Sequence, residues 1–589
     1  MILWEHSNFQ SSCVTKLKTY TTVLGIHDGH DSGAAIVQNG KIIAAISEER
    51  LRNIKRYAGI PSLSIKEVLK ISKLDPSQID LIAISGIMDV TKPTQDSEYP
   101  IYAHLYFNWN SITSRPKTAP SFVSYNHRFR KIDGIKKILD ESGIESKEVV
   151  FVEHHLAHAA SAYYSSPWRL DENVLLFTAD AAGDGLSSTI STAINGEINR
   201  IKNSESTYYN SLGYCFYGEI TSYLGMREDE HEYKVMGLAP YGKSEYCIEK
   251  IKKIIDIDEL NPLKFKNKFN SFKPSFQTKL QKLLQGQRFD NIAAATQEWF
   301  ESLIARWIKN GIKETGIQKI ACSGGCFLNV KANKKILALP EVEDAFFCPA
   351  AGDEGLAVGA ALVGYFEMTT LSGKKPEKVP ISSIYFGTSF SNEEIESSLK
   401  KHNLLENAQF VDDIDGEIGE LISKPDTIVA RFSGAMEWGP RGLGNRSILA
   451  DPSNPNIVRK INKAIKMRDF WMPFGPSILS SRMDEYLIDA EIAPYMILAF
   501  DTTEKRNDLA AAIHPYDLTC RPQTVNSEYN KNYETVLKSF ESKTGIGGIL
   551  NTSFNLHGFP IVYSPDIAIN TFKNSKLDVL SLGNYLIKK

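Results

Sequence analysis

The segment at residues 153–163 combines histidines with small residues in a pattern typical of a helix. His154 and His158 are four residues apart, which places both imidazoles on one face, where they can share a metal ion. Asp180 and Asp353 lie in glycine-rich turns and would add two carboxylates. Two nitrogens and two carboxylates suit Fe, Mn or Zn in the divalent state. For the histidine pair alone, two buried rings that only pack are the alternative.

A further histidine, His30, lies in an Asp/Gly-rich loop at residues 27–31. An unperturbed imidazole titrates near neutrality, as a general base requires. From this residue alone, a polar side chain that stabilises the turn is the simpler interpretation.

Cations of the C-terminal third occur within turns rich in glycine and proline. They are Arg441, Arg446, Lys466, Arg468 and Arg521. Guanidinium groups bind phosphate through two parallel hydrogen bonds, and flanking Gly and Pro would fix these side chains. Asn551 follows an apolar strand and adds a polar ligand. The pattern favours a site for a polyanion with several phosphoryl groups, and a solvated charged face is the alternative.

A third candidate site is a predicted strand at residues 317–323 that runs into two glycines. Gly324 and Gly325 lead into a helix past Asn329. Proteins of the α/β class approach a phosphate or a ribose with such a loop, so we expect these residues to contact a nucleotide.

The elements that must position these groups occur twice. Residues 22–46 read as strand, Asp/Gly loop, strand, Asn-Gly turn and strand, and residues 174–196 repeat this order up to the second Asn-Gly turn. The repeat predicts a duplicated α/β domain whose Asp/Gly loops face each other across a cleft. Two unrelated hairpins are the alternative.

With 589 residues, the chain is long enough for three or four globular units. A polar segment at residues 371–380 is the best linker candidate. We therefore expect one domain at residues 21–370 and another at residues 381–589.

The charge balance excludes some classes of partner. Lys and Arg total 67 against 70 Asp and Glu, a formal net charge of -3, so neither nucleic acid nor an anionic membrane surface is an expected partner. No run of about 18 apolar residues and no basic leader occur. The seven cysteines are scattered, which indicates a reducing compartment, and we expect a cytoplasmic protein.

Taken together, these motifs resemble the O-carbamoyltransferase family, which includes the tobramycin, cephamycin and nodulation-factor enzymes. The resemblance runs from about Val23 to the C-terminus, and the first 20 or so residues lie outside it. It rests on residues 27–32, His154-xxx-His158, residues 233–242, the Gly324-Gly325 loop, residues 439–441, residues 521–523 and residues 551–555.

The resemblance implies an N-terminal domain with the duplicated actin-like ATPase fold, similar to tRNA threonylcarbamoyl transferases. It implies a C-terminal α/β domain similar to the YrdC fold, in which carbamoyl phosphate and ATP form carbamoyl adenylate. That intermediate would pass to the metal site of the first domain and carbamoylate a hydroxyl of a small natural product.

Residue roles also follow from the resemblance. It implies that His154, His158 and Asp353 bind Fe(2+), that Asp180 is a fourth metal or nucleotide contact, and that His30 takes the proton of the acceptor. It implies a carbamoyl phosphate and ATP site at Arg441, Lys466, Arg521 and Asn551, and a nucleotide contact at Lys55. Some members have an arginine where this chain has Met472, so Arg468 or Arg446 would supply that contact.

Three other functions compete with this interpretation. A threonylcarbamoyl transferase acting on tRNA is disfavoured by the net charge of -3 and by the fused C-terminal domain. A hydrogenase-maturation carbamoyltransferase would carry zinc fingers built from Cys-x-x-Cys pairs, which this sequence lacks. The third is an inert actin-like scaffold that binds a nucleotide.

The acceptor is the least determined part of the prediction. The acidic segment at residues 227–232 precedes one of the motifs and suggests a cationic small molecule. A solvated acidic turn is the simpler alternative.

Overall fold

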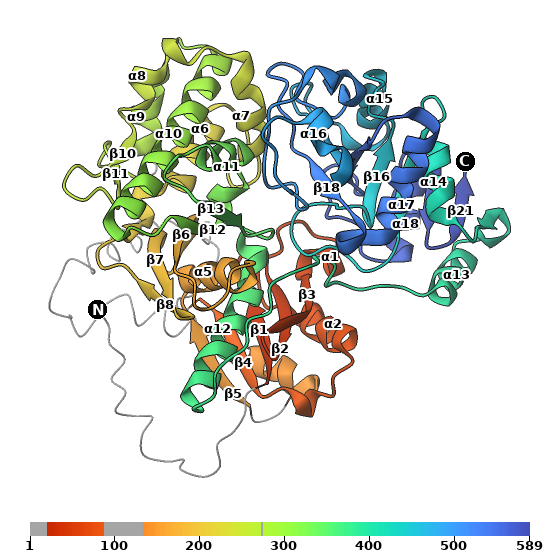
Figure 1. Ribbon diagram of the computed structural model, residues 1–589, viewed down its shortest axis with the longest axis horizontal. Coiled ribbons are helices and arrows are strands. Elements are labelled where there is room, and N and C mark those ends of the chain that lie inside the picture. Colours follow the sequence, from red (N-terminus) through yellow and green to blue (C-terminus); the bar gives the residue numbers. More distant parts are fainter. Residues whose placement is uncertain (1–20, 87–133, 145–146, 273–274) are drawn as a thin grey trace.

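The computed structural model describes residues 21–86, 134–144, 147–272 and 275–589 (Figure 1). They form a mixed α/β protein with three large sheets. None of the helices in these ranges is long and apolar enough to cross a bilayer.

The first sheet has the strand order β3-β2-β1-β4-β5. Its strands are β1 (Thr22–His27), β2 (Gly33–Gln38), β3 (Lys41–Ser47), β4 (Leu81–Ser85) and β5 (Glu148–Val152). Strands β1 to β3 pair antiparallel, whereas β4 and β5 run parallel to β1. Helices α1 (Glu48–Arg52) and α2 (Ser62–Ser72) follow β3.

The second sheet repeats this arrangement in the order β8-β7-β6-β12-β13. Its strands are β6 (Val174–Gly183), β7 (Leu186–Ile194), β8 (Glu197–Arg200), β12 (Lys319–Ser323) and β13 (Asp344–Phe347), and the two-residue β9 (Ser206–Thr207) pairs with β7. Again three antiparallel strands are followed by two parallel ones. The repeated hairpin pattern predicted from the sequence is therefore confirmed.

Two helices, α5 (His154–Ser165) and α12 (Leu356–Leu371), lie between these sheets (Figure 1). Helix α12 contacts β1, β4 and α5, while α5 contacts β6 and β12. Because α12 is apolar on nearly all sides, it is stable only when surrounded by protein. The backbones approach closely, since a Cβ at Gly25 or Gly359 would lie 1.9 Å from the carbonyl oxygen of Ala357 or Ala157 respectively.

A helical region is inserted between β9 and β12. It comprises α6 (Glu219–Tyr223), α7 (Glu232–Leu238), α8 (Ile248–Ile251), the hairpin β10 (Ile255–Ile257) and β11 (Phe265–Asn267), α9 (Ser275–Leu284) and α10 (Phe289–Thr315). Helix α11 (Val330–Leu337) follows β12. The buried Trp307 of α10 packs edge-on against Phe177 of β6 and so attaches this region to the second sheet.

The C-terminal sheet has eight strands in the order β14-β21-β20-β15-β16-β19-β17-β18. They are β14 (Ala408–Phe410), β15 (Ile428–Phe432), β16 (Arg446–Ala450), β17 (Gly475–Leu479), β18 (Gln523–Val525), β19 (Gly548–Ser553), β20 (Val579–Leu582) and β21 (Tyr585–Lys588). One buried cluster includes α13 (Asn392–Lys401), α15 (Asn456–Ile461) and α18 (Pro565–Lys573). The other includes α14 (Ile414–Ile422) and α17 (Ser527–Thr544), and α16 (Met483–Tyr486) follows β17.

The N- and C-terminal parts pack against each other along a long boundary. The indole of Trp471 donates to the carbonyl oxygen of Lys234 at 3.2 Å, and Asn333 donates to that of Ile497 at 2.9 Å. The segment 371–380 leaves the end of α12, and its Lys378 donates to the carbonyl oxygen of Ser166 at 2.9 Å. The predicted linker is thus bound to the surface of the N-terminal part.

Candidate functional site

The four predicted metal ligands lie together between the two N-terminal sheets. His154 Nε2 and His158 Nε2 are 3.2 and 3.3 Å from Asp180 Oδ2, and 3.5 and 3.4 Å from Asp353 Oδ1. One ligand atom from each residue falls within 4.8 Å of all the others. We call these four residues the metal group.

The donor set and spacing fit a divalent cation. Bonds of about 2.1 Å to nitrogen and oxygen would separate tetrahedral ligands by about 3.4 Å, close to the four measured distances. In addition, Asp353 Oδ1 is buried and accepts no hydrogen bond from any residue that the structure describes. A cation would satisfy that oxygen.

Neighbouring groups orient the ligands. Asp184 Oδ2 accepts from the backbone N–H of His154 at 2.7 Å and so fixes the start of α5. The backbone N–H of Gly325 donates to Asp180 Oδ1 at 3.1 Å, while Ser323 Oγ lies 3.3 Å from His158 Nδ1. Such outer contacts hold the rings and carboxylates in place for an ion.

The protonation of the two carboxyls supports the same interpretation. Burial opposes ionisation of Asp180, but hydrogen bonds from His154 and His158 outweigh it and hold its pKa well below the usual range. Burial and the neighbouring Asp180 raise the pKa of Asp353 well above its usual range. A bound cation would counter both effects and favour the ionised form of Asp353.

Gly183, at the end of β6, makes room for a ligand ring. A Cβ there would lie 2.1 Å from two ring atoms of His154. We expect Gly183→Ala to displace this imidazole and weaken metal binding about 10- to 100-fold. Metal titration of the purified variant measures this, with Asp171→Asn as a control because Asp171 is an exposed carboxylate outside the metal group that pairs with Arg169. Unchanged affinity in Gly183→Ala would contradict a ligand role for His154.

The predicted base His30 is exposed in the loop between β1 and β2. Its carbonyl oxygen lies 2.8 Å from Nε2 of His27, and that same nitrogen is 3.9 Å from Asp353 Oδ2. The loop of His30 is therefore adjacent to the metal group. Sequence reasoning assigned no role to His27, although it belongs to the same motif.

Four of the predicted phosphate-binding cations form a cluster in the C-terminal part: Arg441, Lys466, Arg468 and Arg521. Burial and repulsion by Arg441 and Arg468 lower the pKa of Arg521 well below its usual range. Burial and repulsion by Arg468 and Lys55 lower that of Lys466 in the same way. Within the described ranges no carboxylate is ion-paired with any of the four. An anion would relieve this repulsion.

Hydrogen bonds hold two of these cations at neighbouring positions. Lys466 Nζ donates to Ser553 Oγ at 3.1 Å and to Asn555 Oδ1 at 2.6 Å. Arg468 donates to Thr552 Oγ1 at 3.2 Å, and its guanidinium lies over the ring of Phe474. The end of β19 therefore organises the cation cluster.

Arg446 has a different environment from the one predicted. Its fully buried guanidinium donates to four backbone carbonyls, those of Thr388, Ser433, Gly434 and Asn445. Because these bonds occupy both terminal nitrogens, Arg446 holds the loop that carries Arg441 rather than presenting a charge to a ligand. Of the two arginines expected to compensate for Met472, only Arg468 lies in the cluster.

Asn551 is buried beneath the same loop. Its amide donates to the carbonyl oxygen of Gly442 at 3.2 Å and to Ser477 Oγ at 3.0 Å. The side-chain oxygen of Asn551 is buried and has no partner among the described residues. This oxygen can accept a hydrogen bond from a ligand.

The Gly324-Gly325 loop adjoins the metal group through the bond from Gly325 to Asp180. Asn329 caps α11, accepting from the backbone of Ala332 at 3.0 Å and exchanging hydrogen bonds with Gln297. Its amide is therefore occupied by the protein. The nucleotide contact expected of Asn329 remains a prediction.

Lys55 is close to both parts of the chain. Its Nζ lies 3.2 Å from Glu230 Oε1, and its charge lowers the pKa of Lys466. Glu230 also pairs with Arg227 at 2.5 Å. These pairs reduce the charge that the acidic segment 227–232 offers to a cationic acceptor.

Glu354 and Tyr233, which sequence reasoning did not select, interact electrostatically with the cation cluster. Glu354 follows Asp353 directly, has a buried side-chain oxygen without a described partner, and interacts electrostatically with Arg441. Tyr233 of α7 interacts with both Arg441 and Arg468. Trp438 donates to the carbonyl oxygen of Glu354 at 3.3 Å, and a Cβ at Gly439 would lie 3.2 Å from the carbonyl oxygen of Pro349. The loop that carries Asp353 therefore packs against the loop that carries Arg441.

Glu232, at the start of α7, predicts a pH effect on stability. Burial raises its pKa to about 7. Folded protein therefore keeps a proton that the unfolded chain loses above about pH 4.3, and the free energy of unfolding falls as pH rises towards 7. We expect Glu232→Gln to gain on the order of 1–2 kcal/mol at pH 8 and nothing at pH 4. Urea unfolding at both values measures this, and an equal gain at both would contradict it.

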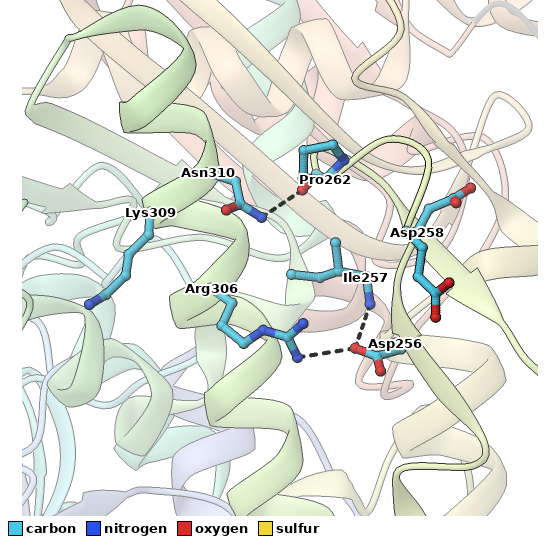
Figure 2. Close-up of a pocket in the computed structure, with 8 residues that line it drawn as sticks. Asp256, Ile257, Asp258, Pro262, Arg306, Lys309 and Asn310 are labelled. Carbon is cyan, nitrogen blue, oxygen red and sulfur yellow. Dashed lines mark hydrogen bonds and ion pairs between the residues drawn. The ribbon is translucent and has the colours of Figure 1, made fainter.

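A surface recess of about 400 Å³ lies between the β10–β11 hairpin and α10 (Figure 2). Its polar groups bind one another, since Arg306 pairs with Asp256 at 3.0 Å and Asn310 donates to Pro262 at 2.9 Å. None of the predicted site residues lines it. We assign this recess no function.

Comparison with known proteins identifies the family. Residues 22–362 match the model of the carbamoyltransferase N-terminus, and residues 420–589 match that of the carbamoyltransferase C-terminus. The chain belongs to the carbamoyltransferase family. As a carbamoyltransferase it is a transferase enzyme.

Relatives cover nearly the whole carbamoyltransferase. The uncharacterized protein MJ1051 of Methanocaldococcus jannaschii is 32% identical over 96% of this chain and 99% of its own. Nodulation protein NolNO of Sinorhizobium fredii is 31% identical over 95% of this chain and 79% of its own.

Among solved structures, full-length HypF in its phosphate- and nucleotide-bound form is 14% identical, with a TM-score of 0.35 over 59% of this carbamoyltransferase and 56% of HypF. At that score the similarity supports no functional conclusion.

Proposed function

We propose that this protein transfers the carbamoyl group of carbamoyl phosphate, through carbamoyl adenylate, to a hydroxyl of a small natural product in the cytoplasm. The observation that carries the proposal is the adjacency of the cation cluster and the metal group, whose loops meet where Trp438 donates to the carbonyl oxygen of Glu354 at 3.3 Å. The cation cluster suits the binding of anionic substrates, and the metal group suits the activation of a carbonyl.

In the first reaction, carbamoyl phosphate, ATP and one water give carbamoyl adenylate, pyrophosphate and phosphate. Arg441, Lys466, Arg468 and Arg521 would bind the phosphoryl groups, whose negative charge replaces the missing carboxylates. The unpartnered oxygen of Asn551 is suited to accept from the amino group of the carbamoyl moiety.

Carbamoyl adenylate decomposes in water, so its route must be short and closed. Glu354 follows the metal ligand candidate Asp353, and Trp438 of the C-terminal part donates to its carbonyl oxygen at 3.3 Å, so the two parts are in contact beside the metal group. The intermediate would therefore move within the protein.

In the second reaction, the acceptor oxygen bonds to the carbamoyl carbon, the bond to AMP breaks, and His30 takes the hydroxyl proton. A divalent ion held by His154, His158, Asp180 and Asp353, which we propose to be Fe(2+), would polarise the carbamoyl carbonyl. His30 is exposed, so an acceptor can reach it from solvent.

The domain architecture forms part of the proposal. The two N-terminal sheets have the same strand arrangement, and two helices lie between them. This arrangement supports assignment of the N-terminal part to the duplicated actin-like ATPase fold. The C-terminal part would be the YrdC-like domain that forms carbamoyl adenylate.

The test is incubation of the iron-loaded protein with carbamoyl phosphate and ATP. Pyrophosphate release should depend on carbamoyl phosphate, and a panel of tobramycin, a hydroxymethyl cephem and chitotetraose should reveal a product heavier by one carbamoyl group. Absence of carbamoyl-dependent pyrophosphate would refute the proposal. Consumption of ATP that requires tRNA and threonine would favour threonylcarbamoyl transfer instead.

A further inference from the structure

His27, the last residue of β1, is a buried imidazole with both ring nitrogens in use. It is 5% exposed. Nδ1 lies 2.7 Å from Ser85 Oγ at the end of β4, and Nε2 lies 2.8 Å from the carbonyl oxygen of His30. The ring thus connects the neighbouring strand to the loop of the proposed base.

The chemistry of these contacts fixes the tautomer. A carbonyl oxygen only accepts, so Nε2 must carry the proton that is donated to His30. Nδ1 of the neutral ring then accepts from the Ser85 hydroxyl. Neither nitrogen has a lone pair free for a metal, which separates His27 from the metal group, although its Nε2 is 3.9 Å from Asp353 Oδ2.

The loop also packs on the ring. A Cβ at Gly29 would lie 2.7 Å from Cε1 and 2.8 Å from Nε2 of His27. The backbone of residues 28–31 therefore passes directly over the imidazole. Ring shape and the Nε2 proton together determine where this loop, and with it His30, stands beside the metal group.

We propose that His27 is a positioning residue for carbamoyl transfer, which acts by holding the loop of His30 in place. This rests on the proposed function, in which His30 takes the proton of the acceptor. His27 touches neither the acceptor nor the carbamoyl group, and its effect passes through the backbone of the loop.

The first test reads the loop directly and needs no acceptor. We expect His27→Leu to increase amide hydrogen exchange of the peptide at residues 28–32 at least about tenfold, because it lacks the donor to His30. His27→Gln places an amide N–H near Nε2 and should restore most of the protection. Unchanged exchange in His27→Leu would overturn the proposal.

The second test is a double-mutant cycle on the transfer step. Transfer is followed as AMP release from carbamoyl phosphate and ATP, with chitotetraose, tobramycin or water as the acceptor. His27→Leu should lower kcat about 10- to 100-fold with KM for the acceptor little changed, and should add nothing in a His30→Ala background. Additive losses, or loss of bound iron from His27→Leu, would overturn the proposal.

The controls separate this inference from the proposed function. Pyrophosphate release should be unaffected by His27→Leu, because the ring nitrogens of His27 bond to Ser85 and His30 and to no residue of the cation cluster. Absence of pyrophosphate release from the wild-type protein would reject the adenylation step alone. A wild-type transfer rate in His30→Ala would reject both the proposed base and the positioning role.

Discussion

Asp353→Asn should lower carbamoyl transfer at least about a hundredfold while pyrophosphate release continues at the wild-type rate. Asp353 contributes the oxygen that lies 3.5 and 3.4 Å from the two histidine nitrogens. The amide keeps the shape of the side chain but removes its charge, so iron binding should weaken. Because Asp180 already repels the carboxylate of Asp353, the variant should fold at least as well as the wild type.

Two measurements check this result: bound iron per chain and AMP release in the presence of an acceptor. Asp171→Asn is the matched control, since Asp171 is an exposed carboxylate on the connection between α5 and β6 and pairs only with Arg169 among the described residues. It should change neither measurement. Full transfer activity in Asp353→Asn would exclude Asp353 from the metal group.

Lys466→Met should lower pyrophosphate release about a hundred- to a thousandfold and yet stabilise the protein. Lys466 is 3% exposed, and burial together with Arg468 and Lys55 disfavours its charge. Methionine fills the same space without that charge. Ser553 and Asn555 keep their mutual hydrogen bond of 2.8 Å, so no polar group loses its only partner. The expected gain in unfolding free energy is about 1–2 kcal/mol.

Pyrophosphate assays and thermal unfolding without substrate measure the two effects of Lys466→Met. Lys538→Met is the matched control, because Lys538 is 59% exposed and pairs with Glu534 on the surface of α17. Carbamoyl phosphate should raise the melting temperature of the wild type and not that of Lys466→Met. A less stable variant that retains pyrophosphate release would contradict the assignment of Lys466 to the anion site.

Local periodicity made much of the N-terminal fold and site predictable. The four-residue spacing of His154 and His158 specifies one face of a helix, and the Asn-Gly turns specify hairpins, because both signals depend only on nearby residues. Asp180 and Asp353 were recognisable from their glycine-rich turns. Their meeting with the histidines requires the packing of α12 on α5, which no local pattern encodes.

For two predicted ligand contacts, Arg446 and Asn329, the structure shows surroundings that the sequence does not indicate. Arg441 lies in the glycine-rich loop before β16 and Arg446 begins that strand, and of the two only Arg446 has its guanidinium bonded to backbone carbonyls. Asn329 likewise caps a helix, a role that sequence alone does not distinguish from ligand binding. Which donors remain free depends on tertiary hydrogen bonding.

Sequence reasoning missed other residues for a different reason. His27 stands three positions before His30 in one motif, and nothing in the sequence tells the buried ring from the exposed one. Glu354 and Tyr233 interact electrostatically with Arg441, which is far from both in the sequence. A charge pattern read along the chain does not reveal such proximity.

The direct backbone contacts of α12 have a consequence for metal selectivity. Gly25 and Gly359 allow α12 to touch β1 and α5 without an intervening layer of side chains. Asp353 lies just before α12, and His154 and His158 lie on α5, so three ligands stand on backbones that are locked together. An ion bound there would therefore enter a site that is already ordered, and little of its binding free energy would be spent on ordering ligands. A rigid metal site of this kind would discriminate between ions by their radius, because its ligands would not move apart to fit a larger ion.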